Sequence, residues 1–388
     1  MPITMDGKSR DLTRRDLLVQ GLAFPFALQA MFASEARATI LGVVPFLDDK
    51  LSPSTITEHG DKIIPFDLTR LMGWITPADQ FYIRNHFAVP KVSNARDWSI
   101  RVGGNVRHAQ QIGLDEFSEF PRVERVVTLE CAGNSKRRNH GLVSNAKWTG
   151  VPLHAVLEKA GLQPNARNIV FHGADSGGRS ARHFARALSI EQARRPEVML
   201  ATDMNDKPLP HDHGFPVRLI VPSWYGMAHV KWLERIEVID TPFDGMYQTT
   251  HYVNKRAISS DSDAVWKPEQ ITKIPVKSIV ATVLRDYHAV GNLYQVSGVV
   301  WGGHTPIQAV NITIDGNTHR HSATLQPHTH PFAWTRWSYQ WENQISGIHT
   351  LASRGIDRAG HRQPSERSSR LRGPYQHDET ILRRVKLS

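Results

Sequence analysis

Hydrophobic and polar residues alternate in short runs along most of the chain after residue 75. Such runs at 98–102 and 126–129 predict β-strands. The stretch 154–160 predicts a short helix that ends at Gly161, and 113–120 predicts another. Because short strands and short helices follow one another without repeated long crossovers, the pattern favours a mixed α+β domain over a doubly wound parallel sheet.

The pattern changes near residue 260, where short alternating runs are separated by turn signals. The expected strands are 275–283, 293–300, 309–314, 333–339 and 349–353. Strands at this spacing indicate a small β-sandwich of immunoglobulin type. We therefore expect one domain over 39–265 and a second over 266–388. The arginine- and serine-rich tail after Pro364 is interpreted as a mobile end or as an arm that lies on a neighbouring molecule.

Residues 1–38 have the pattern of a targeting segment. Arg14 and Arg15 precede a moderately apolar run, 17–33, and a small-x-small cleavage signal follows at 36–38. This order is typical of a twin-arginine export signal and predicts a periplasmic protein. The alternative is an amphipathic helix or anchor, but the run is short and interrupted for a membrane span, so we expect no stable membrane anchor.

The charge balance is basic, with 47 lysines and arginines against 37 aspartates and glutamates and a formal net charge of +10. A basic protein can bind nucleic acid, an anionic membrane surface or small anions. No nucleic-acid-binding motif occurs, so we expect no nucleic-acid partner. Arginines scattered among histidines and aromatic residues favour a small oxyanion as the ligand instead.

Cys131 is the only cysteine of the chain. A single cysteine can form neither an internal disulfide nor a thiolate cage for a metal. The residue is therefore an inert buried thiol, a nucleophile, or one ligand of a metal that is held mostly by other groups. It follows a predicted strand and precedes Gly133 and the cations Lys136, Arg137 and Arg138. We expect these neighbours to lower its pKa and to favour the thiolate.

Five motifs occur in a fixed order after the export signal. They are Phe-Tyr-Ile-Arg-Asn-His at 81–86, Thr-Leu-Glu-Cys-Ala-Gly-Asn at 128–134, Ala-Lys-Trp-Thr-Gly-Val-Pro-Leu at 146–153, Asp-His-Gly-Phe-Pro-Val-Arg at 212–218 and His-Val-Lys-Trp at 229–232. Together the motifs resemble the sulfite oxidase family of molybdopterin enzymes. The resemblance extends over about 55–365. It implies a mixed α/β molybdopterin-binding domain followed by an immunoglobulin-like β-sandwich that forms a homodimer.

The resemblance implies a molybdenum ion held by the dithiolene sulfurs of molybdopterin and by one cysteine, which Cys131 matches. One cysteine is then sufficient, because the cofactor supplies the other sulfurs. The pterin carries a phosphate and many hydrogen-bonding edges, which require cations, amides and backbone donors. The residues that match its binding segments are Tyr82, Ile83, Arg84, Asn85, His86, Asp175, His213, Arg218, His229, Val230 and Lys231. Taken alone, His213 and Arg218 would indicate a salt-bridged turn, and Asp175 an ordinary turn.

Two matches concern the substrate. Arg84 lies where the family has an arginine that holds the substrate oxyanion, and a guanidinium group donates in a planar fork suited to such oxygens. Tyr252 matches the active-site tyrosine of the family, although a packed tyrosine without a catalytic role is the alternative. The resemblance therefore implies oxidation of sulfite to sulfate. The sequence contains no Cys-x-x-Cys-His haem motif, so we expect electrons to pass singly to a separate c-type cytochrome.

The sequence departs from the family pattern beside the cysteine, where the segment 135–146 is shorter. The candidates for the missing substrate residues are Lys136, Arg137, Arg138 and, in the second domain, Arg336. These departures leave two other activities open, oxidation of carrier-bound sulfur and reduction of an S-oxide. From a different class, the chain could be an inactive anion-binding or assembly protein whose β-sandwich is the working part.

Overall fold

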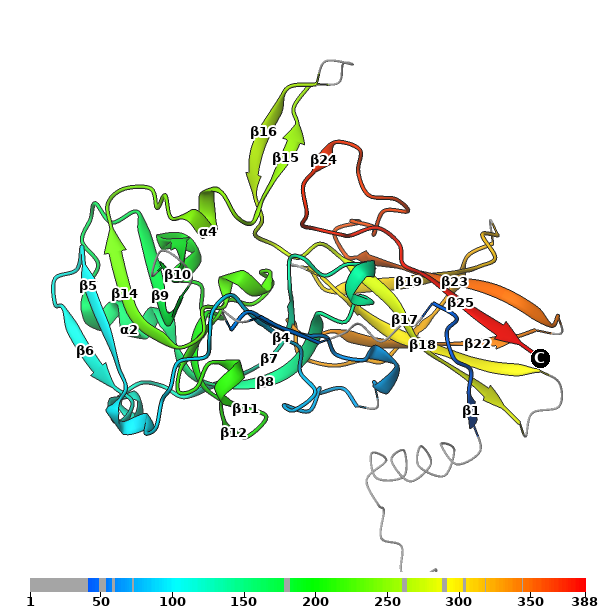
Figure 1. Ribbon diagram of the computed structural model, residues 1–388, viewed down its shortest axis with the longest axis horizontal. Coiled ribbons are helices and arrows are strands. Elements are labelled where there is room, and N and C mark those ends of the chain that lie inside the picture. Colours follow the sequence, from blue (N-terminus) through cyan, green and yellow to red (C-terminus); the bar gives the residue numbers. More distant parts are fainter. Residues whose placement is uncertain are drawn as a thin grey trace, which may run out of the picture.

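The computed structural model describes residues 41–48, 54–57, 60–71, 73–177, 182–259, 264–287, 292–302, 305–317, 319–343 and 345–388. The predicted export signal at 1–38 lies outside these residues. Figure 1 shows an N-terminal and a C-terminal lobe side by side, built mostly of strands with few short helices. The α+β prediction therefore overstated the helical content of the described residues.

The first sheet of the N-terminal lobe has the strand order β10-β9-β14-β5-β6. Its strands are β5 (Ser99–Gly104), β6 (Gln110–Gly113), β9 (Asn168–Gly177), β10 (Arg182–Ser189) and β14 (Leu233–Ile239). Strands β14 and β5 run parallel, and the other neighbours are antiparallel. The sheet is therefore mixed, and the strands that follow each other closely in sequence, β5–β6 and β9–β10, form its hairpin pairs.

The second sheet carries the cysteine and has the order β12-β11-β8-β7, with β13 paired to β11. Its strands are β7 (Val123–Glu130), β8 (Val143–Pro152), β11 (Met199–Met204), β12 (Lys207–Pro208) and β13 (Arg218–Ile220). Strand β7 is buried from Val126 to its end. Cys131 directly follows that end, so the strand holds the cysteine inside the molecule.

A small third sheet, β2-β3-β4, and the helices complete this lobe. The elements are β2 (Thr55–Ile56), β3 (Lys62–Ile64), β4 (Ile83–Asn85), α2 (Leu153–Ala160), α3 (Ile190–Ala193), α4 (Met246–Thr249) and the 3-10 helices η2 (Leu68–Arg70), η3 (Ala95–Asp97), η4 (Asp115–Glu119), η5 (Lys136–Arg138), η6 (His211–His213) and η7 (Gly226–Ala228). Helix α2 confirms the predicted helix, and Gly161 ends it with a φ of 68° that suits glycine. The helix predicted at 113–120 is the shorter 3-10 helix η4.

Two antiparallel sheets form the C-terminal lobe, in the orders β1-β17-β18-β22-β21 and β20-β19-β23-β25. Their strands are β1 (Leu41–Val43), β17 (Lys277–Asp286), β18 (Leu293–Trp301), β19 (Ile307–Ile314), β20 (His321–Ser322), β21 (Thr324–Leu325), β22 (Thr335–Glu342), β23 (Gly347–Asp357) and β25 (Leu382–Leu387). Val280 and Val296 of one sheet share a buried cluster with Val310 and Leu351 of the other. The two sheets thus enclose one core, as in a sandwich.

The boundary between the predicted domains falls inside a hairpin. Its strands are β15 (Val253–Ala257) and β16 (Trp266–Gln270), and β24 (Leu371–Arg372) pairs with β15. Strand β1, which precedes the N-terminal lobe, belongs to the C-terminal sheet. The tail after Pro364 contributes β24 and β25 to sheets of its own chain, so its interpretation as a mobile end or an arm on a neighbour is wrong.

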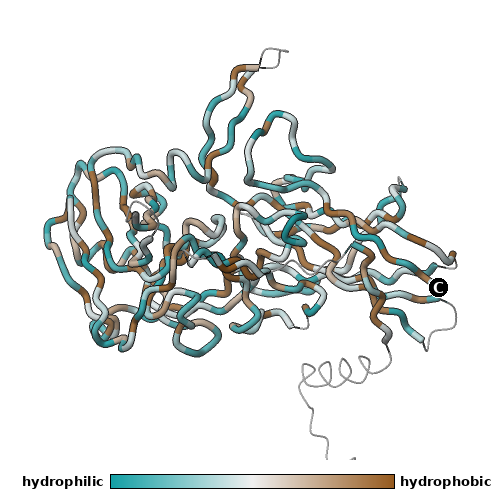
Figure 2. The backbone as a smooth tube through the Cα atoms, in the orientation of Figure 1, coloured by the Kyte–Doolittle hydropathy of each residue, from teal (hydrophilic) through white to brown (hydrophobic). Residues whose placement is uncertain are grey.

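The two lobes meet at the strand that carries the cysteine. The Glu130 carboxylate, fully buried, forms an ion pair with Lys277 of β17 and accepts a hydrogen bond of 2.8 Å from the Trp301 indole of β18. Further along β7, the Thr128 amide donates to the Phe332 carbonyl. Figure 2 shows hydrophobic segments gathered at this junction. The C-terminal lobe therefore holds the end of β7, and with it Cys131, in place.

Candidate active site

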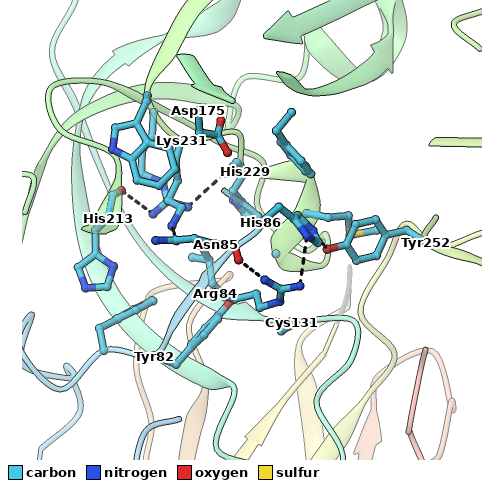
Figure 3. A pocket seen from close by; sticks show the side chains of 17 residues that line it. Tyr82, Arg84, Asn85, His86, Cys131, Asp175, His213, His229, Lys231 and Tyr252 are labelled. Carbon is cyan, nitrogen blue, oxygen red and sulfur yellow. Dashed lines mark hydrogen bonds between the residues drawn. The ribbon is translucent and has the colours of Figure 1, made fainter. Parts of the chain in front are cut away.

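A cavity lies in the N-terminal lobe beside Cys131 (Figure 3). Eleven of the thirteen residues predicted for the site line it: Tyr82, Arg84, Asn85, His86, Cys131, Asp175, His213, Arg218, His229, Lys231 and Tyr252. The other two, Ile83 and Val230, do not. Ile83 alternates with Arg84 along the pleat of β4. Val230 is fully buried in the hydrophobic core, so only its backbone stays near the site.

Cys131 sits at the wall of the cavity with 9% of its surface exposed. Its backbone is fixed on both sides, since its amide donates to Leu142 and its carbonyl accepts from the Asn134 amide, each at 2.9 Å. Burial raises the pKa of the Cys131 thiol more than Arg84 lowers it. The predicted lowering of this pKa is therefore wrong for the protein alone. A thiolate here requires an additional positive charge, such as a coordinated metal ion.

Arg84, His86 and Tyr252, which we call the tyrosine side of the cavity, form one hydrogen-bonded chain (Figure 3). An Arg84 guanidinium nitrogen lies 3.2 Å from His86 Nδ1, and His86 Nε2 lies 2.5 Å from the Tyr252 hydroxyl oxygen. Guanidinium only donates, so Nδ1 accepts and the proton of the neutral ring is on Nε2. Burial lowers the pKa of His86 well below its usual value, which agrees with a neutral ring. The Tyr252 oxygen accepts from His86, so its own proton is free to point into the cavity.

A second layer of residues orients the tyrosine side. Asp61 pairs with Arg84, and the Arg186 guanidinium lies 5.9 Å from the centre of the Tyr252 ring. The Tyr375 ring of the C-terminal tail lies 4.9 Å from the Tyr252 ring, centre to centre. Burial raises the pKa of Tyr252, so its hydroxyl stays protonated. The sequence offered no signal for these supporting residues, because only the tertiary fold brings them to the site.

His213, Arg218 and His229, which we call the cradle side, are held by backbone groups instead. Arg218 donates to the His213 carbonyl at 2.8 Å and to the His229 carbonyl at 3.3 Å. His229 Nδ1 accepts from the Val221 amide and Nε2 donates to the Trp224 carbonyl, both at 3.1 Å. Burial lowers the pKa of both His213 and His229 to about 3, so both rings are neutral. Backbone groups of the fold thus fix the cradle side.

Lys231, Asn85 and Asp175 lie between the two sides (Figure 3). The Lys231 ammonium donates to the Asn85 side-chain oxygen and, at 2.8 Å, to the Asp212 carbonyl. Burial lowers the pKa of Lys231 well below its usual value and raises that of Asp175 to about 7. Both shifts show that charge in this part of the cavity is poorly solvated.

The donor set of the cavity fits an anionic ligand that has many hydrogen-bonding edges. Three buried polar atoms among its lining residues have no hydrogen-bond partner, Asn85 Nδ2, Asp175 Oδ1 and Arg218 Nε. Buried polar atoms without partners are rare in native proteins and indicate that a ligand completes the site. Two are donors and one is an acceptor, as the edges of a pterin require. The residues present therefore fit molybdopterin, and Cys131 offers a thiol that could hold its metal.

The cations proposed to complete the substrate pocket do not line the cavity. The charge of Arg138 lowers the pKa of Cys131 slightly, but its guanidinium donates to the Thr55 hydroxyl. Lys136 and Arg137 share the 3-10 helix η5 with it, and Arg336 lies on β22 of the C-terminal lobe. The sequence missed other lining residues, among them Phe184 and Met227, because they belong to no motif.

The described residues contain no cluster of side chains that would bind a metal by itself and no helix that would cross a membrane. No group of three or more histidine, cysteine, aspartate or glutamate side chains in them is arranged to bind a metal ion. None of their helices is long and apolar enough to span a bilayer. A metal at Cys131 must therefore bring most of its ligands with it.

Comparisons with known proteins agree with this description. The family model "Oxidoreductase molybdopterin binding domain" matches residues 86–247. NADH nitrate reductase 2 of Phaseolus vulgaris is 32% identical over 343 residues, which cover 76% of this chain and 38% of that protein. Mitochondrial sulfite oxidase of Drosophila melanogaster is 32% identical over 290 residues, 68% of this chain and 50% of that protein. The chain thus spans half or less of the length of these relatives.

A solved structure shares the fold over nearly the whole chain. The sulfane dehydrogenase SoxCD of Paracoccus pantotrophus superposes with a TM-score of 0.74 and 22% sequence identity, covering 98% of this chain and 96% of that chain. Molybdopterin with molybdenum is the cofactor of the matched domain. The match, the relatives and the cavity beside Cys131 agree, and the chain belongs to the sulfite oxidase family of molybdopterin oxidoreductases.

Proposed function

We propose that this protein oxidises sulfite to sulfate in the cavity beside Cys131. The observation that carries the proposal is the hydrogen-bonded chain from Arg84 through His86 to Tyr252. It presents a guanidinium group and a free hydroxyl proton beside the cysteine. These are the groups that a small, doubly charged oxyanion requires.

Molybdopterin would lie against the cradle side, with Arg218 and Asn85 donating to its acceptor edges and Cys131 supplying one thiolate to the metal. When bound, the cofactor supplies oxygen-atom transfer to sulfur and accepts two electrons. The neutral rings of His213 and His229 form hydrogen bonds with backbone groups. The chain therefore provides a preformed cradle, which lowers the entropy cost of binding.

The protein's own contribution to the reaction is binding and orientation. Arg84 holds an oxygen of sulfite, and Asp61 and His86 keep the guanidinium plane fixed. The Tyr252 hydroxyl donates a hydrogen bond into the cavity, where negative charge develops on oxygen. Because these groups are buried and preorganised, their interactions are stronger than they would be in water.

The overall reaction defines the partners. Sulfite and water give sulfate, two protons and two electrons. We infer that the electrons pass one at a time to a separate c-type cytochrome. We also propose export by the twin-arginine route to the periplasm and a homodimer formed through the C-terminal lobe.

The test is sulfite-dependent reduction of a c-type cytochrome by the exported holoprotein. Wild type should reduce the cytochrome with sulfite, and the Cys131→Ser variant should fold but show no turnover. Nitrate with a reduced dye, and sulfur bound to a carrier protein, serve as comparison substrates because the relatives' names include nitrate reductase and sulfane dehydrogenase. Activity with only one of these, and none with sulfite, would replace the proposed substrate.

A further inference from the structure

One short segment of the C-terminal tail, 373–376, contacts both the cysteine loop and the tyrosine of the candidate active site. We call this segment the clasp. The Gln376 amide donates at 2.9 Å to the carbonyl of Ala132, the residue after the cysteine. The Tyr375 ring lies 4.9 Å from the Tyr252 ring, with an angle of 31° between the two planes. Two adjacent residues of the tail therefore reach the two parts of the site whose relative position matters for the reaction.

The clasp is tied to the strand that the tyrosine precedes. It follows β24, which lies beside β15 in Figure 1. The Tyr375 carbonyl accepts from Asn254 at 3.1 Å and from Arg367 at 2.8 Å, and Arg367 also donates to the Gly373 carbonyl at 2.7 Å. Asn254 is fully buried on β15, and this strand begins directly after Tyr252. The same short strand therefore holds both rings, so they keep their relative position.

Backbone strain marks this contact. Tyr252 and Gln376 have φ values of 57° and 61°, in the left-handed region that residues other than glycine rarely adopt. Residues in such conformations persist only where the surrounding structure holds them, and they cluster at functional sites. The Tyr252 carbonyl accepts from the Ile271 amide at 2.9 Å, and the Gln376 amide is held by Ala132. The fold thus maintains two strained residues at the point where the tail meets the site.

The Tyr252 hydroxyl is the group that this contact can position. Its oxygen lies 2.5 Å from His86 Nε2, and one hydrogen bond does not fix the tilt of a phenol ring. The contacts of the ring therefore decide where the hydroxyl proton points. The centre of the Tyr252 ring lies 5.7 Å from that of His86, 5.9 Å from the Arg186 guanidinium and 4.9 Å from the centre of the Tyr375 ring. Tyr375 is the nearest of these three neighbours.

We infer that Tyr375 is a positioning residue for the reaction. Its ring sets the direction in which the Tyr252 hydroxyl donates into the cavity, and the clasp keeps that hydroxyl at a fixed position relative to Cys131. The inference rests on the proposed function, because it deepens the account of the same site. Tyr375 is not among the residues that line the cavity, so it acts through Tyr252 and touches neither substrate nor cofactor.

The kinetic test compares Tyr375→Ala, which removes the ring, with Tyr375→Phe, which keeps it. Tyr339→Ala is the matched control, because the Tyr339 ring makes a similar contact, 5.0 Å from the His321 ring, in the C-terminal lobe and does not line the cavity. Sulfite oxidation by each holoprotein is measured with ferricyanide, a small one-electron acceptor, together with molybdenum content. If Tyr375→Ala does not fold, Tyr375→Leu keeps apolar bulk without the planar ring and takes its place in each comparison.

We expect Tyr375→Ala to lower kcat/KM for sulfite by about two- to tenfold, no more than loss of the Tyr252 hydroxyl itself. The loss should fall mainly on kcat, because the hydroxyl donates where charge develops in the transition state. Molybdenum content should not change, and Tyr375→Phe and Tyr339→Ala should match wild type. In the Tyr252→Phe background, Tyr375→Ala should cause no further loss, since the ring acts through the missing hydroxyl.

Hydrogen exchange gives a second readout that does not depend on turnover. The Gln376 and Ile271 amides report the bonds to the Ala132 and Tyr252 carbonyls. Both amides should exchange faster in Tyr375→Ala than in wild type, and neither should change in Tyr375→Phe or in the control variant.

Three kinetic results would overturn the inference. They are an unchanged kcat/KM in Tyr375→Ala, an equal loss in Tyr339→Ala, and a double variant whose loss is the product of the two single losses. If wild type does not oxidise sulfite, the proposed function fails and hydrogen exchange decides the positioning role. Faster exchange of both amides in Tyr375→Ala alone would then support the role, and unchanged exchange would overturn it.

Discussion

The two sides of the cavity solve the problem of buried polar groups differently. On the cradle side, His213, Arg218 and His229 bond to backbone carbonyls and amides, whose positions are set by the fold. On the tyrosine side, Arg84, His86 and Tyr252 bond mainly to one another. Side chains that are fixed by backbone groups are rigid, which suits cofactor binding. Side chains that are hydrogen-bonded to one another can pass a shift in position or charge from one residue to the next, which suits the part of the site where the substrate reacts.

The largest effect should come from breaking the cradle side. In Arg218→Met, the His213 and His229 carbonyls lose their buried donor, and each loss costs about 1–3 kcal/mol. We expect a lower free energy of unfolding in urea and a preparation with little molybdenum or pterin. Arg218→Lys keeps the charge but loses the planar, two-pronged guanidinium donor. Its unfolding free energy and cofactor content should lie between those of wild type and Arg218→Met. A variant with full stability and full metal content would show that the cradle is not built on this residue.

Acid should also act on the cradle side. His213 and His229 have pKa values near 3 in the folded protein because they are buried, whereas unfolded histidine has a pKa of about 6.5. The unfolded state therefore binds more protons below pH 6.5, and stability falls as the pH decreases. Each histidine should contribute about 1.4 kcal/mol per pH unit between these values. Urea unfolding at pH 7.5 and 5.5 measures the slope, and the His229→Asn variant should lessen it. An identical slope in that variant would contradict the neutral ring.

A smaller effect, on the kinetics but not on cofactor content, is expected from the tyrosine side. Arg84→Gln should raise KM for sulfite, because a charge-assisted hydrogen bond is lost. The fall in kcat/KM should correspond to about 1.5–3 kcal/mol of transition-state stabilisation. Molybdenum content should stay at the wild-type level. Steady-state kinetics over a sulfite series measures the change. If KM is unchanged while metal content falls, Arg84 belongs with the cradle and the comparison between the two sides fails.

The smallest effect should follow removal of one hydroxyl group. Tyr252→Phe keeps the ring that lies against Arg186 and Tyr375 and removes the hydroxyl, which both donates into the cavity and accepts from His86 Nε2. We expect kcat/KM for sulfite to fall by a factor that corresponds to about 0.5–1.5 kcal/mol, with metal content intact. Steady-state kinetics over a sulfite series measures the fall in kcat/KM. Tyr375→Phe is the matched control and should behave as wild type. Equal losses in both variants would indicate a packing effect instead.

The alternating runs at 98–102, 126–129 and 293–300 predicted strands, and β5, β7 and β18 occupy these positions. The motifs named eleven residues that line the cavity, because the family resemblance orders them along the chain. Ile83 was included because it lies inside a motif, and the pleat of β4 excludes it. The pKa of Cys131 was predicted in the wrong direction, since its neighbours in sequence indicate cations but not burial. Tyr375 could not be found, because only the docking of the C-terminal tail brings it to Tyr252.

The central claim is that Cys131 is the one protein ligand of a molybdenum ion carried by molybdopterin. Molybdenum K-edge X-ray absorption counts the sulfur ligands directly, in wild type and in Cys131→Ser. The account predicts a sulfur shell in wild type that loses one sulfur in the variant, while the pterin sulfurs stay. An identical sulfur count in the two proteins, or wild type without molybdenum after correct export, would contradict it.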